Sequence, residues 1–478
     1  MSVRSSLLAS FLDRYAALGL NIVSSMVLAR LLTPTEVGVF SVVMVLLALV
    51  NTVRDLGAGQ YLLQAKELTP AMVRSVWAVQ LGLGSLLALL TLAGSQPVAA
   101  FYRDERIVPI MALLALNYLA NPFGSITYAW LMREMRFATL AWARFASALA
   151  GALLSIGLAW KGFGPISLAW GSLATTVVNA LVLSLARPAN FPWLPGLQHF
   201  RDVLAFGSRL TGASVLNTLT AGAPEFLLAR LQSLTAAGFY SRAGGLVAMF
   251  RSLVSDAVMA VALPLFAKAA REQRDVPAAF ARVQAYMTAV GWSFGACTAL
   301  LAYPAVRVLY GDQWDPAVPL VRWLALALLF QVPVSTCQTA LASTGGAPAL
   351  LRASSWASAL TLSLTAFGAW QGMEVLAACM LPAALGSLGL WLWQVRRHLG
   401  LSLSLLARAC APSLGVALCC AAGPGLVVLL WGWTPAPAPA LALGVPTAVI
   451  GFLAGCWLFK HPLREELTPV LQGLRRPR

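Results

Sequence analysis

Charge is scarce in this chain. Only 10% of its 478 residues are Asp, Glu, Lys or Arg, whereas 59% are hydrophobic, and the mean hydropathy is +0.77. A soluble protein of this length could not hydrate so apolar a surface, so a soluble globular fold is excluded. The composition predicts an all-α polytopic membrane protein.

Cysteine and histidine are too few and too scattered for a metal site or a redox centre. The seven cysteines lie in apolar stretches without a C-x-x-C spacing, and we interpret them as small hydrophobes that pack between helices. His199, His398 and His461 lie in three separate polar segments. We therefore predict no metal site and expect no cofactor. The longest external loops, around 96–106 and 304–317, are too short to hold a folded catalytic domain, so we predict no catalytic residue and no enzyme activity.

Long apolar runs are abundant. Polar breaks divide the sequence into fourteen runs of about 20 residues, which is the length that a helix needs to cross a bilayer. The expected spans are 6–29, 39–63, 75–95, 107–131, 141–160, 166–186, 205–229, 239–264, 283–303, 318–342, 353–371, 375–394, 410–432 and 441–459. In the first span Asp13 and Arg14 interrupt the apolar run early, which favours an uncleaved helix over a signal peptide.

The basic residues are distributed unevenly between the two sides of these spans. With the N-terminus in the cytoplasm, 22 of the 33 Lys and Arg fall in cytoplasmic segments, six fall outside, and five lie within spans. Cytoplasmic segments of membrane proteins are enriched in Lys and Arg, so this asymmetry predicts that both termini are cytoplasmic. The net charge of +16 therefore reports topology, and nucleic acid is not an expected partner.

A segment of fourteen residues is repeated two hundred positions later, without gaps and with half of its positions identical. Residues 28–41 (LARLLTPTEVGVFS) align with residues 228–241 (LARLQSLTAAGFYS), with seven identities that include Arg, Thr, Gly and Ser. Each copy lies where one apolar run ends and the next begins, so each predicts a tight corner between two helices. Two similar halves are typical of a transporter with its binding site between them.

Six spans separate the two copies, so the halves enter the membrane in the same direction, as parallel repeats. Prolines inside spans 4 and 10, Pro122 and Pro333, can kink their helices. The last two spans have no counterpart in the repeat. The predicted organisation is an N-lobe at 1–186, a cytoplasmic linker at 187–204, a C-lobe at 205–394, an appended helical hairpin at 395–460 and a basic cytoplasmic tail at 461–478.

Ionisable residues within the spans are functional candidates, because a charge at membrane depth is costly. Eight of the nine fall in the first two spans of each lobe, which predicts a polar cavity lined by those four helices. The nine residues are Asp13, Arg14, Arg54, Asp55, Glu225, Arg242, Arg251, Asp256 and Arg322.

These residues fall into two groups by charge. The candidates for substrate binding in the cavity are Arg251, Arg14, Arg54, Arg242, Asn21 and Asn51. The candidates for ion coupling or charge balance are Asp13, Asp55, Glu225 and Asp256. Uptake of a proton or Na⁺ by these acids and simple neutralisation of neighbouring arginines are equally compatible with the spacing. Purely structural roles stay open for Arg14, the Arg54–Asp55 pair, Arg242 and Arg322, which lie toward span ends.

Four segments resemble a known family. They are ARLLTPTEVG at 29–38, RDLGAG at 54–59, MREMRF at 132–137 and GFYSRA at 238–243. Together they are similar to the Wzx-type flippases of lipid-linked oligosaccharides, in the polysaccharide-transport branch of the multidrug/oligosaccharidyl-lipid/polysaccharide exporter superfamily. The likeness extends over roughly residues 1–400 and rests on corners and packing features.

The resemblance implies that two lobes open alternately to either side of the bacterial inner membrane. It implies that undecaprenyl-diphosphate-linked oligosaccharide is flipped from the cytoplasmic to the periplasmic leaflet for surface polysaccharide synthesis. A polysaccharide polymerase and glycosyltransferases are the implied partners, and we expect a monomer. A peptidoglycan-precursor flippase and a multidrug exporter of the same superfamily are the alternatives.

Overall fold

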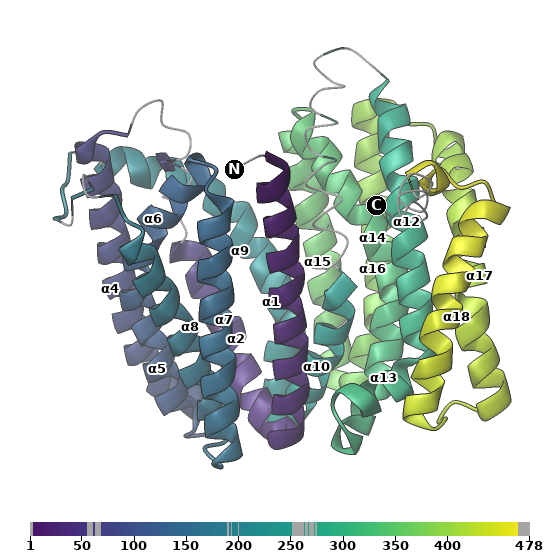
Figure 1. Ribbon diagram of the computed structural model, residues 1–478, viewed down its shortest axis with the longest axis horizontal. Coiled ribbons are helices and arrows are strands. Elements are labelled where there is room, and N and C mark those ends of the chain that lie inside the picture. The colour runs from purple at the N-terminus through teal and green to yellow at the C-terminus, as the bar shows by residue number, and fades with distance from the viewer. Residues whose placement is uncertain are drawn as a thin grey trace. The chain divides into compact units, whose positions relative to one another are not determined.

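The structure is a computed structural model that describes residues 3–54, 61–62, 68–188, 191–192, 194–198, 200–250, 262, 266, 272 and 275–466. Side chains are described for these residues except 3–15, 53, 201–214, 250 and 347. Every regular element in these ranges is a helix (Figure 1). The all-α prediction is confirmed for the described part of the chain.

The chain forms two compact units, Met1–Gly238 (unit 1) and Phe239–Arg478 (unit 2). The helices of unit 1 are α1 (Val3–Leu31), α2 (Pro34–Arg54), α4 (Pro70–Tyr102), α5 (Ile107–Ala120), α6 (Pro122–Arg133), α7 (Phe137–Trp160), α8 (Ile166–Leu185) and α9 (Phe200–Leu231). Helix α10 (Leu234–Phe250) begins in unit 1 and continues into unit 2. The elements of unit 2 are α12 (Val276–Leu300), α13 (Ala302–Leu309), the 3₁₀ turn η2 (Asp312–Ala317), α14 (Val318–Ser343), α15 (Ala347–Gln371), α16 (Met373–Leu399), α17 (Leu403–Trp431) and α18 (Pro437–Leu458).

The helices coincide with the expected spans. Each of the fourteen apolar runs overlaps one helix or one bent pair of helices. Among the described residues, eight helices are long and apolar enough to cross a membrane, or up to ten if each bent pair counts as one span. A polytopic membrane protein is therefore confirmed, while the count of fourteen spans stays a prediction.

Polar caps and prolines fix where several helices begin. At the start of α2, Thr33 Oγ1 accepts a hydrogen bond from Glu36 N (3.3 Å), and Thr33 N donates to Glu36 Oε2 (2.8 Å). This reciprocal pair is a capping box, followed by Pro34 at the first helical position. At the equivalent corner in the second copy of the repeat, Ser233 Oγ caps α10 by accepting from Ala236 N (3.0 Å). Both predicted corners are confirmed.

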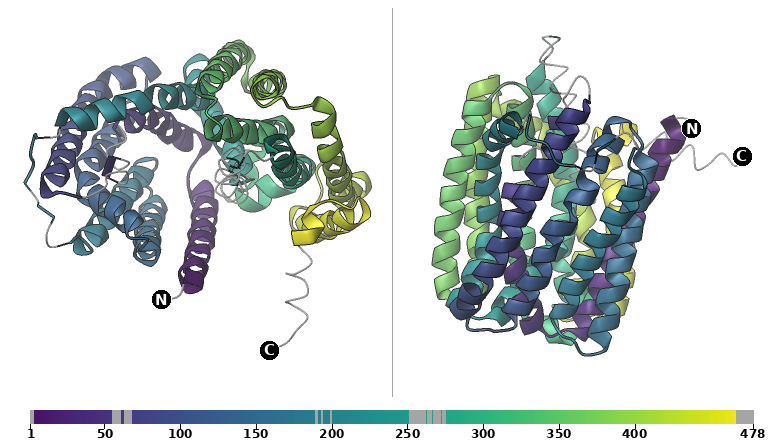
Figure 2. Two further views of the ribbon diagram at one scale, coloured as in Figure 1. Left: turned by 90° about the horizontal axis from the view of Figure 1, so that it is seen from above. Right: turned by 90° about the vertical axis from the view of Figure 1, so that its left-hand side faces the viewer.

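In unit 1 the long helices run nearly parallel to one another (Figure 2, right). Helix α4 packs against α5, α7 packs against α8, and α1 packs against α7. Between α7 and α8 the contact is made by small residues, because a Cβ on Gly151 or Gly171 would lie 2.8 Å from the other residue's carbonyl oxygen. Small residues let helix backbones approach closely in a membrane, where lipid removes the hydrophobic force between helices. Large apolar side chains such as Leu153 (64% exposed) point outward.

In unit 2, α12 is central and packs against both α14 and α17. Helices α15 and α16 pack together, and α17 packs against α18 (Figure 1). The appended hairpin α17–α18 therefore lies against α12, with α18 also contacting α13. The hairpin is an integral part of unit 2.

Two spans are bent at breaks in the helix. The axis turns by 48° between α5 and α6, where Pro122 begins α6, as the sequence predicts. It turns by 77° between α12 and α13, at Leu301, where the only sequence signal is Pro304 in the first turn of α13. Pro333 lies inside the continuous helix α14 and does not break it.

The compact units and the expected lobes divide the chain at different places. The expected boundary is the linker at 187–204, before α9, whereas the compact units divide after Gly238. Helix α9 belongs to unit 1 because it packs against α2 and α4. A Cβ on Gly222 of α9 would overlap the side chain of Val45 of α2, and Thr218 Oγ1 lies 3.0 Å from Thr52 Oγ1. The division into two lobes that move against each other stays a prediction. So do the appended hairpin at 395–460 and the basic tail at 461–478.

Candidate functional site

The structure describes only part of the predicted site. Asp55, Arg251 and Asp256 lie outside the described residues. Asp13 and Arg14 lie on the helical backbone of α1, and their side chains are outside the description. For all five, the predicted cavity roles stay predictions.

Three candidates with described side chains lie on the first two helices. Asn21 lies on α1 with an exposed side chain, and its carbonyl oxygen accepts a hydrogen bond from Ser24 Oγ (3.4 Å). Asn51 and Arg54 lie one helical turn apart in the last turns of α2, and both are partly buried. An amide at membrane depth is a neutral hydrogen-bonding group, and a guanidinium is a permanent cation, so this end of α2 can offer both to a polar ligand.

Glu225 lies on α9 and is also partly buried. In the sequence, Thr211, Ser214, Thr218 and Glu225 are spaced as a polar stripe along one face of this helix. The structure shows that Thr218 of this stripe faces α2, where its hydroxyl contacts that of Thr52. Part of the stripe therefore serves helix packing. The sequence did not predict the contact between Thr52 and Thr218, because the same helical spacing places a hydroxyl either toward a cavity or toward a neighbouring helix.

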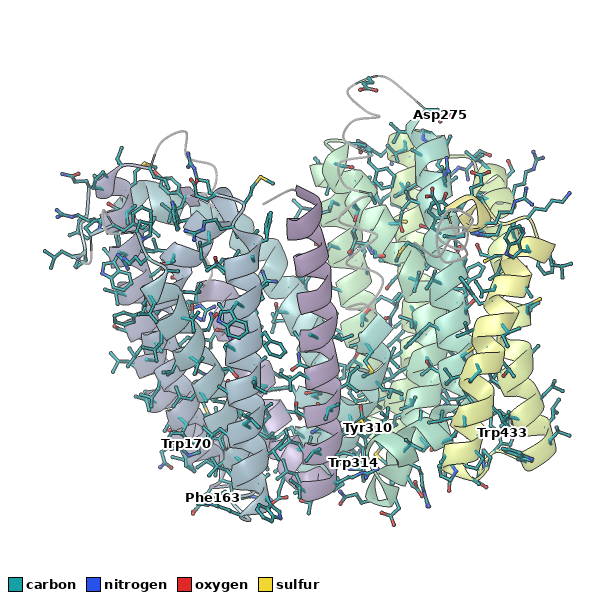
Figure 3. The ribbon with its side chains drawn as sticks, viewed as in Figure 1. Phe163, Trp170, Asp275, Tyr310, Trp314 and Trp433 are labelled. Atoms are coloured by element: carbon teal, nitrogen blue, oxygen red, sulfur yellow. The ribbon has the colours of Figure 1, made fainter. Side chains whose placement is uncertain are left out.

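Arg242 lies on α10 in unit 2, against two aromatic rings. Its guanidinium carbon is 5.8 Å from the centre of the Tyr310 ring and 5.7 Å from the centre of the Trp314 ring. Both rings come from the segment between α13 and α14 (Figure 3). A cation against aromatic faces gains electrostatic stabilisation, which offsets part of the cost of burial. This contact gives Arg242 a structural role beside the predicted one in ligand binding.

Arg322 lies near the start of α14 and holds the loop of the appended hairpin. Its Nη2 donates to the carbonyl oxygen of Trp433 (3.4 Å), and its guanidinium carbon lies 4.6 Å from the centre of the Trp433 ring. Trp433 belongs to the turn between α17 and α18. These contacts are consistent with a purely structural role for Arg322, which the sequence left open.

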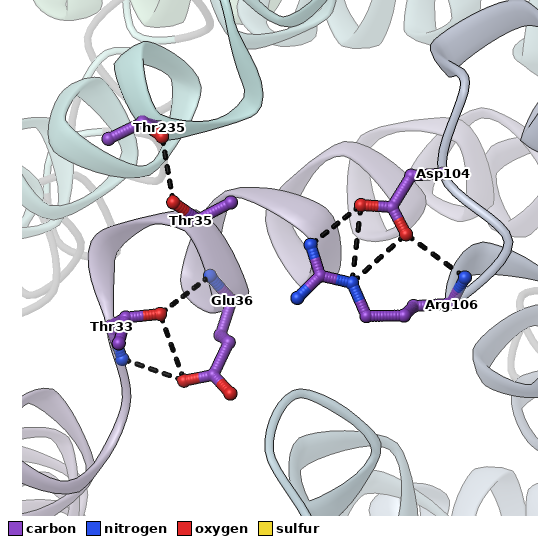
Figure 4. A network of polar contacts seen from close by, with 6 residues as sticks. All are labelled: Thr33, Thr35, Glu36, Asp104, Arg106 and Thr235. Carbon is purple, nitrogen blue, oxygen red and sulfur yellow. Dashed lines mark hydrogen bonds and ion pairs between the residues drawn. The ribbon is translucent and has the colours of Figure 1, made fainter.

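A network of polar groups lies at the loop end of unit 1 (Figure 4). Arg106 Nε and Nη2 donate to the two carboxylate oxygens of Asp104, at 3.0 and 2.7 Å, on the turn between α4 and α5. This bidentate hydrogen bonding lowers the pKa of Asp104. Glu36 lies nearby in the capping box of α2. The contacts that Figure 4 draws lie at three corners of unit 1, between α1 and α2, between α4 and α5, and between α9 and α10.

The cysteines of the described chain are free thiols, and no group of three or more described His, Cys, Asp or Glu is arranged to hold a metal ion. Cys297 and Cys420 approach each other, with 3.5 Å between their Sγ atoms, where α12 packs on α17. That placement between helices is the one that the sequence predicts. Among the candidates whose side chains are described, Asn21, Asn51, Arg54 and Glu225 belong to unit 1, and Arg242 belongs to unit 2.

The chain is similar to transport proteins of polysaccharide synthesis. It is 27% identical to the succinoglycan biosynthesis transport protein ExoT of Rhizobium meliloti, over 77% of this chain and 74% of that protein. It is 23% identical to the lipopolysaccharide biosynthesis protein WzxC of Escherichia coli, over 66% of this chain and 64% of that protein.

The fold resembles that of the lipid II flippase MurJ in an inward closed conformation. The TM-score is 0.78 and the sequence identity 13%, with 97% of this chain and 99% of that chain covered. At that identity the likeness describes the fold alone. The family described as polysaccharide biosynthesis proteins matches residues 27–319, more than half of the sequence. This all-helical membrane protein therefore belongs to the polysaccharide biosynthesis protein family.

Proposed function

We propose that this protein flips an undecaprenyl-diphosphate-linked oligosaccharide from the cytoplasmic to the periplasmic leaflet of the bacterial inner membrane. The observation that carries the proposal is the family match over residues 27–319. It is supported by relatives named for succinoglycan transport and lipopolysaccharide biosynthesis, and by a fold similar to that of a lipid flippase. None of these proteins is named as an enzyme, and the proposed activity is transport alone.

The chemistry of the cargo explains why charged residues are retained at membrane depth. A diphosphate and its sugars cannot enter hydrocarbon without compensation, because removing polar and charged groups from water is costly. Arginine suits a semi-dry path, since it stays charged and its planar fork binds phosphate oxygens in pairs. In the proposal Arg251, Arg14 and Arg54 engage the diphosphate or acidic sugars, and the lipid tail stays in the bilayer.

The amide groups of Asn21 and Asn51 are proposed to bind sugar hydroxyls along the same path, with Arg242 as a further cation. Rocking of one half against the other exchanges access between the two leaflets. In the proposed topology both termini are cytoplasmic, the protein acts as a monomer, and glycosyltransferases and a polymerase act before and after it.

The acidic residues within the spans are the candidates for energy coupling. Asp13, Asp55, Glu225 and Asp256 can bind H⁺ or Na⁺ when arginines change partners, or can simply balance those arginines. A flippase for peptidoglycan precursors is the second candidate, favoured by the likeness to the lipid II flippase fold. A multidrug exporter is disfavoured by the slight excess of arginine over acid within the spans.

Translocation of a radiolabelled lipid-linked oligosaccharide into purified proteoliposomes tests the activity directly. Lipid II, presented in the same vesicles, separates the two candidates, and imposed pH and Na⁺ gradients test coupling. If neither lipid crosses faster than in empty vesicles, the proposal is wrong.

We expect Arg251→Ala to reduce translocation at least about tenfold, because a hydrogen bond to a charged group contributes about 1.5–3 kcal/mol. Lys161→Ala is the matched control, since it removes an exposed cation from the turn between α7 and α8. Both variants must be inserted at equal levels. Full translocation by Arg251→Ala would remove this arginine from the proposed site.

A further inference from the structure

The two copies of the internal repeat touch each other through equivalent residues. Thr35 Oγ1 lies 2.7 Å from Thr235 Oγ1, so a threonine is hydrogen-bonded to its own counterpart two hundred positions later (Figure 4). Both residues lie in the first turn of their helices, α2 and α10, and both belong to unit 1. Neither the sequence repeat nor the family match assigns this contact a role.

The glycines of the repeat make a reciprocal contact beside the threonines. A Cβ on Gly38 would overlap the carbonyl oxygen of Leu234, and a Cβ on Gly238 would overlap the carbonyl oxygen of Pro34. Positions 34 and 234 are themselves counterparts in the repeat. Gly38 thus contacts residue 234, and its counterpart Gly238 contacts residue 34, the counterpart of 234. This exchange of partners is the pattern of a two-fold, isologous interface. A local two-fold axis therefore passes between the two corners.

This contact can part at little cost. It contains one hydroxyl–hydroxyl bond and two approaches of a glycine to a backbone carbonyl. A threonine hydroxyl that loses its partner can bond back to a carbonyl of its own helix, as Thr52 Oγ1 does to Ala48 O (2.8 Å). Each of the two threonine hydroxyls can therefore keep a hydrogen bond when the corners separate. Interlocked apolar side chains would resist separation much more strongly.

We propose that Thr35, Gly38, Thr235 and Gly238 form a latch (the corner latch) that closes one end of the transport path and opens once in each cycle. This inference rests on the proposed function, because a latch needs a path to close. The glycines are required since any side chain would hold the corners apart. The threonines give the closed state its register.

Disulfide cross-linking tests the latch. In a protein whose seven cysteines are replaced, Thr35→Cys and Thr235→Cys are combined, with a protease site added between α8 and α9 to detect the bond. A copper–phenanthroline oxidant removes two electrons and two protons as the disulfide forms. We expect rapid cross-linking, at least about tenfold slower translocation, and full recovery with a reductant.

The matched control is Asn117→Cys with Ser172→Cys. Asn117 Nδ2 and Ser172 Oγ are 3.2 Å apart and join α5 to α8 within unit 1, away from the corners. Their disulfide, detected with a protease site in the turn between α7 and α8, should form without slowing translocation. Failure of the 35–235 bond to form, or undiminished translocation by the cross-linked protein, overturns the latch.

The glycines provide a readout that does not depend on transport. Gly38→Ala should slow formation of the 35–235 disulfide by about tenfold, equivalent to about 1.4 kcal/mol. Gly244→Ala, on α10 with no atom within 4 Å of its added Cβ, should leave the rate unchanged. Equal rates in both variants overturn the steric part of the proposal.

Failure of the proposed function would look different. If the reduced 35–235 variant and the unmodified protein both fail to translocate the lipid, the function is wrong, and the latch is judged by a rigid bismaleimide longer than the closed contact. Cross-linking by that reagent supports an opened state. Complete resistance to it, while the disulfide forms fully, overturns the latch.

Discussion

Arginine side chains near the ends of the helices meet aromatic rings in the described part of the chain. Arg242 lies against Tyr310 and Trp314, and Arg322 lies against Trp433. The face of an aromatic ring attracts a cation, so these contacts stabilise both guanidinium groups. An arginine in an apolar run is therefore not by itself evidence for an anionic ligand. The sequence alone overestimates how many arginines are available to bind such a ligand.

A buried histidine ends the last span. His461 is fully buried, and the backbone N–H of Leu463 donates to its Nδ1 (3.1 Å). The proton of the neutral ring therefore resides on Nε2, which lies 3.1 Å from Ser413 Oγ. Thr288 Oγ1 donates to the same serine oxygen (3.0 Å), so the network joins α12, α17 and the end of α18.

Acid should weaken this network. Burial lowers the pKa of His461 below its ordinary value of 6.5. The unfolded chain then binds the proton more readily than the folded protein, so the stabilisation by neutral His461 is complete above about pH 6.5 and is lost as the pH falls. We expect the unfolding temperature in detergent to fall between pH 7.5 and 5.5.

His461→Asn should flatten this pH dependence and lower stability at pH 7.5 by about 1–3 kcal/mol, because buried hydrogen bonds are lost. His398→Asn is the control, since His398 is exposed at the end of α16. An unchanged slope in His461→Asn would exclude this histidine as the sensor.

At the scale of the helix, close packing depends on particular glycines. We expect Gly171→Ala to destabilise the protein by about 1–3 kcal/mol, because the added Cβ lies 2.8 Å from the carbonyl oxygen of Gly151 and forces α7 and α8 apart. Gly157→Ala, on α7 with no atom within 4 Å of its Cβ, should be neutral or stabilising by about 0.5–1 kcal/mol. Thermal unfolding in detergent measures both, and equal effects would contradict the steric account.

The positions of helices were predictable because apolar length and polar breaks are local properties of the sequence. The bend at Pro122 was predictable for the same reason. The 77° bend at Leu301 has only one local signal, Pro304, which does not fix where the helix breaks. The pairing of Thr52 with Thr218 depends on which helices are neighbours, so no local pattern reveals it. The same limit applies to the site. Sequence spacing identifies Asn51 and Arg54 as polar groups at depth, yet it cannot say which neighbour each one faces.

At the scale of the whole chain, the distribution of Lys and Arg predicts orientation. In a cysteine-free protein, Lys161→Cys should react with a membrane-impermeant maleimide added to the periplasmic side. Arg397→Cys should react only after the inner membrane is permeabilised, and both residues are exposed. The opposite labelling pattern would reverse the topology and, with it, the direction of the proposed transport.

The appended hairpin is fastened at both extremities of α18. Arg322 holds the turn that precedes this helix, and the His461 network holds the segment that follows it. A helix pinned at its two ends cannot swing independently of α12 and α14. A fluorophore on Leu458→Cys, whose side chain is 70% exposed, would thus act as a rigid handle that reports the motion of the entire second unit rather than local fraying.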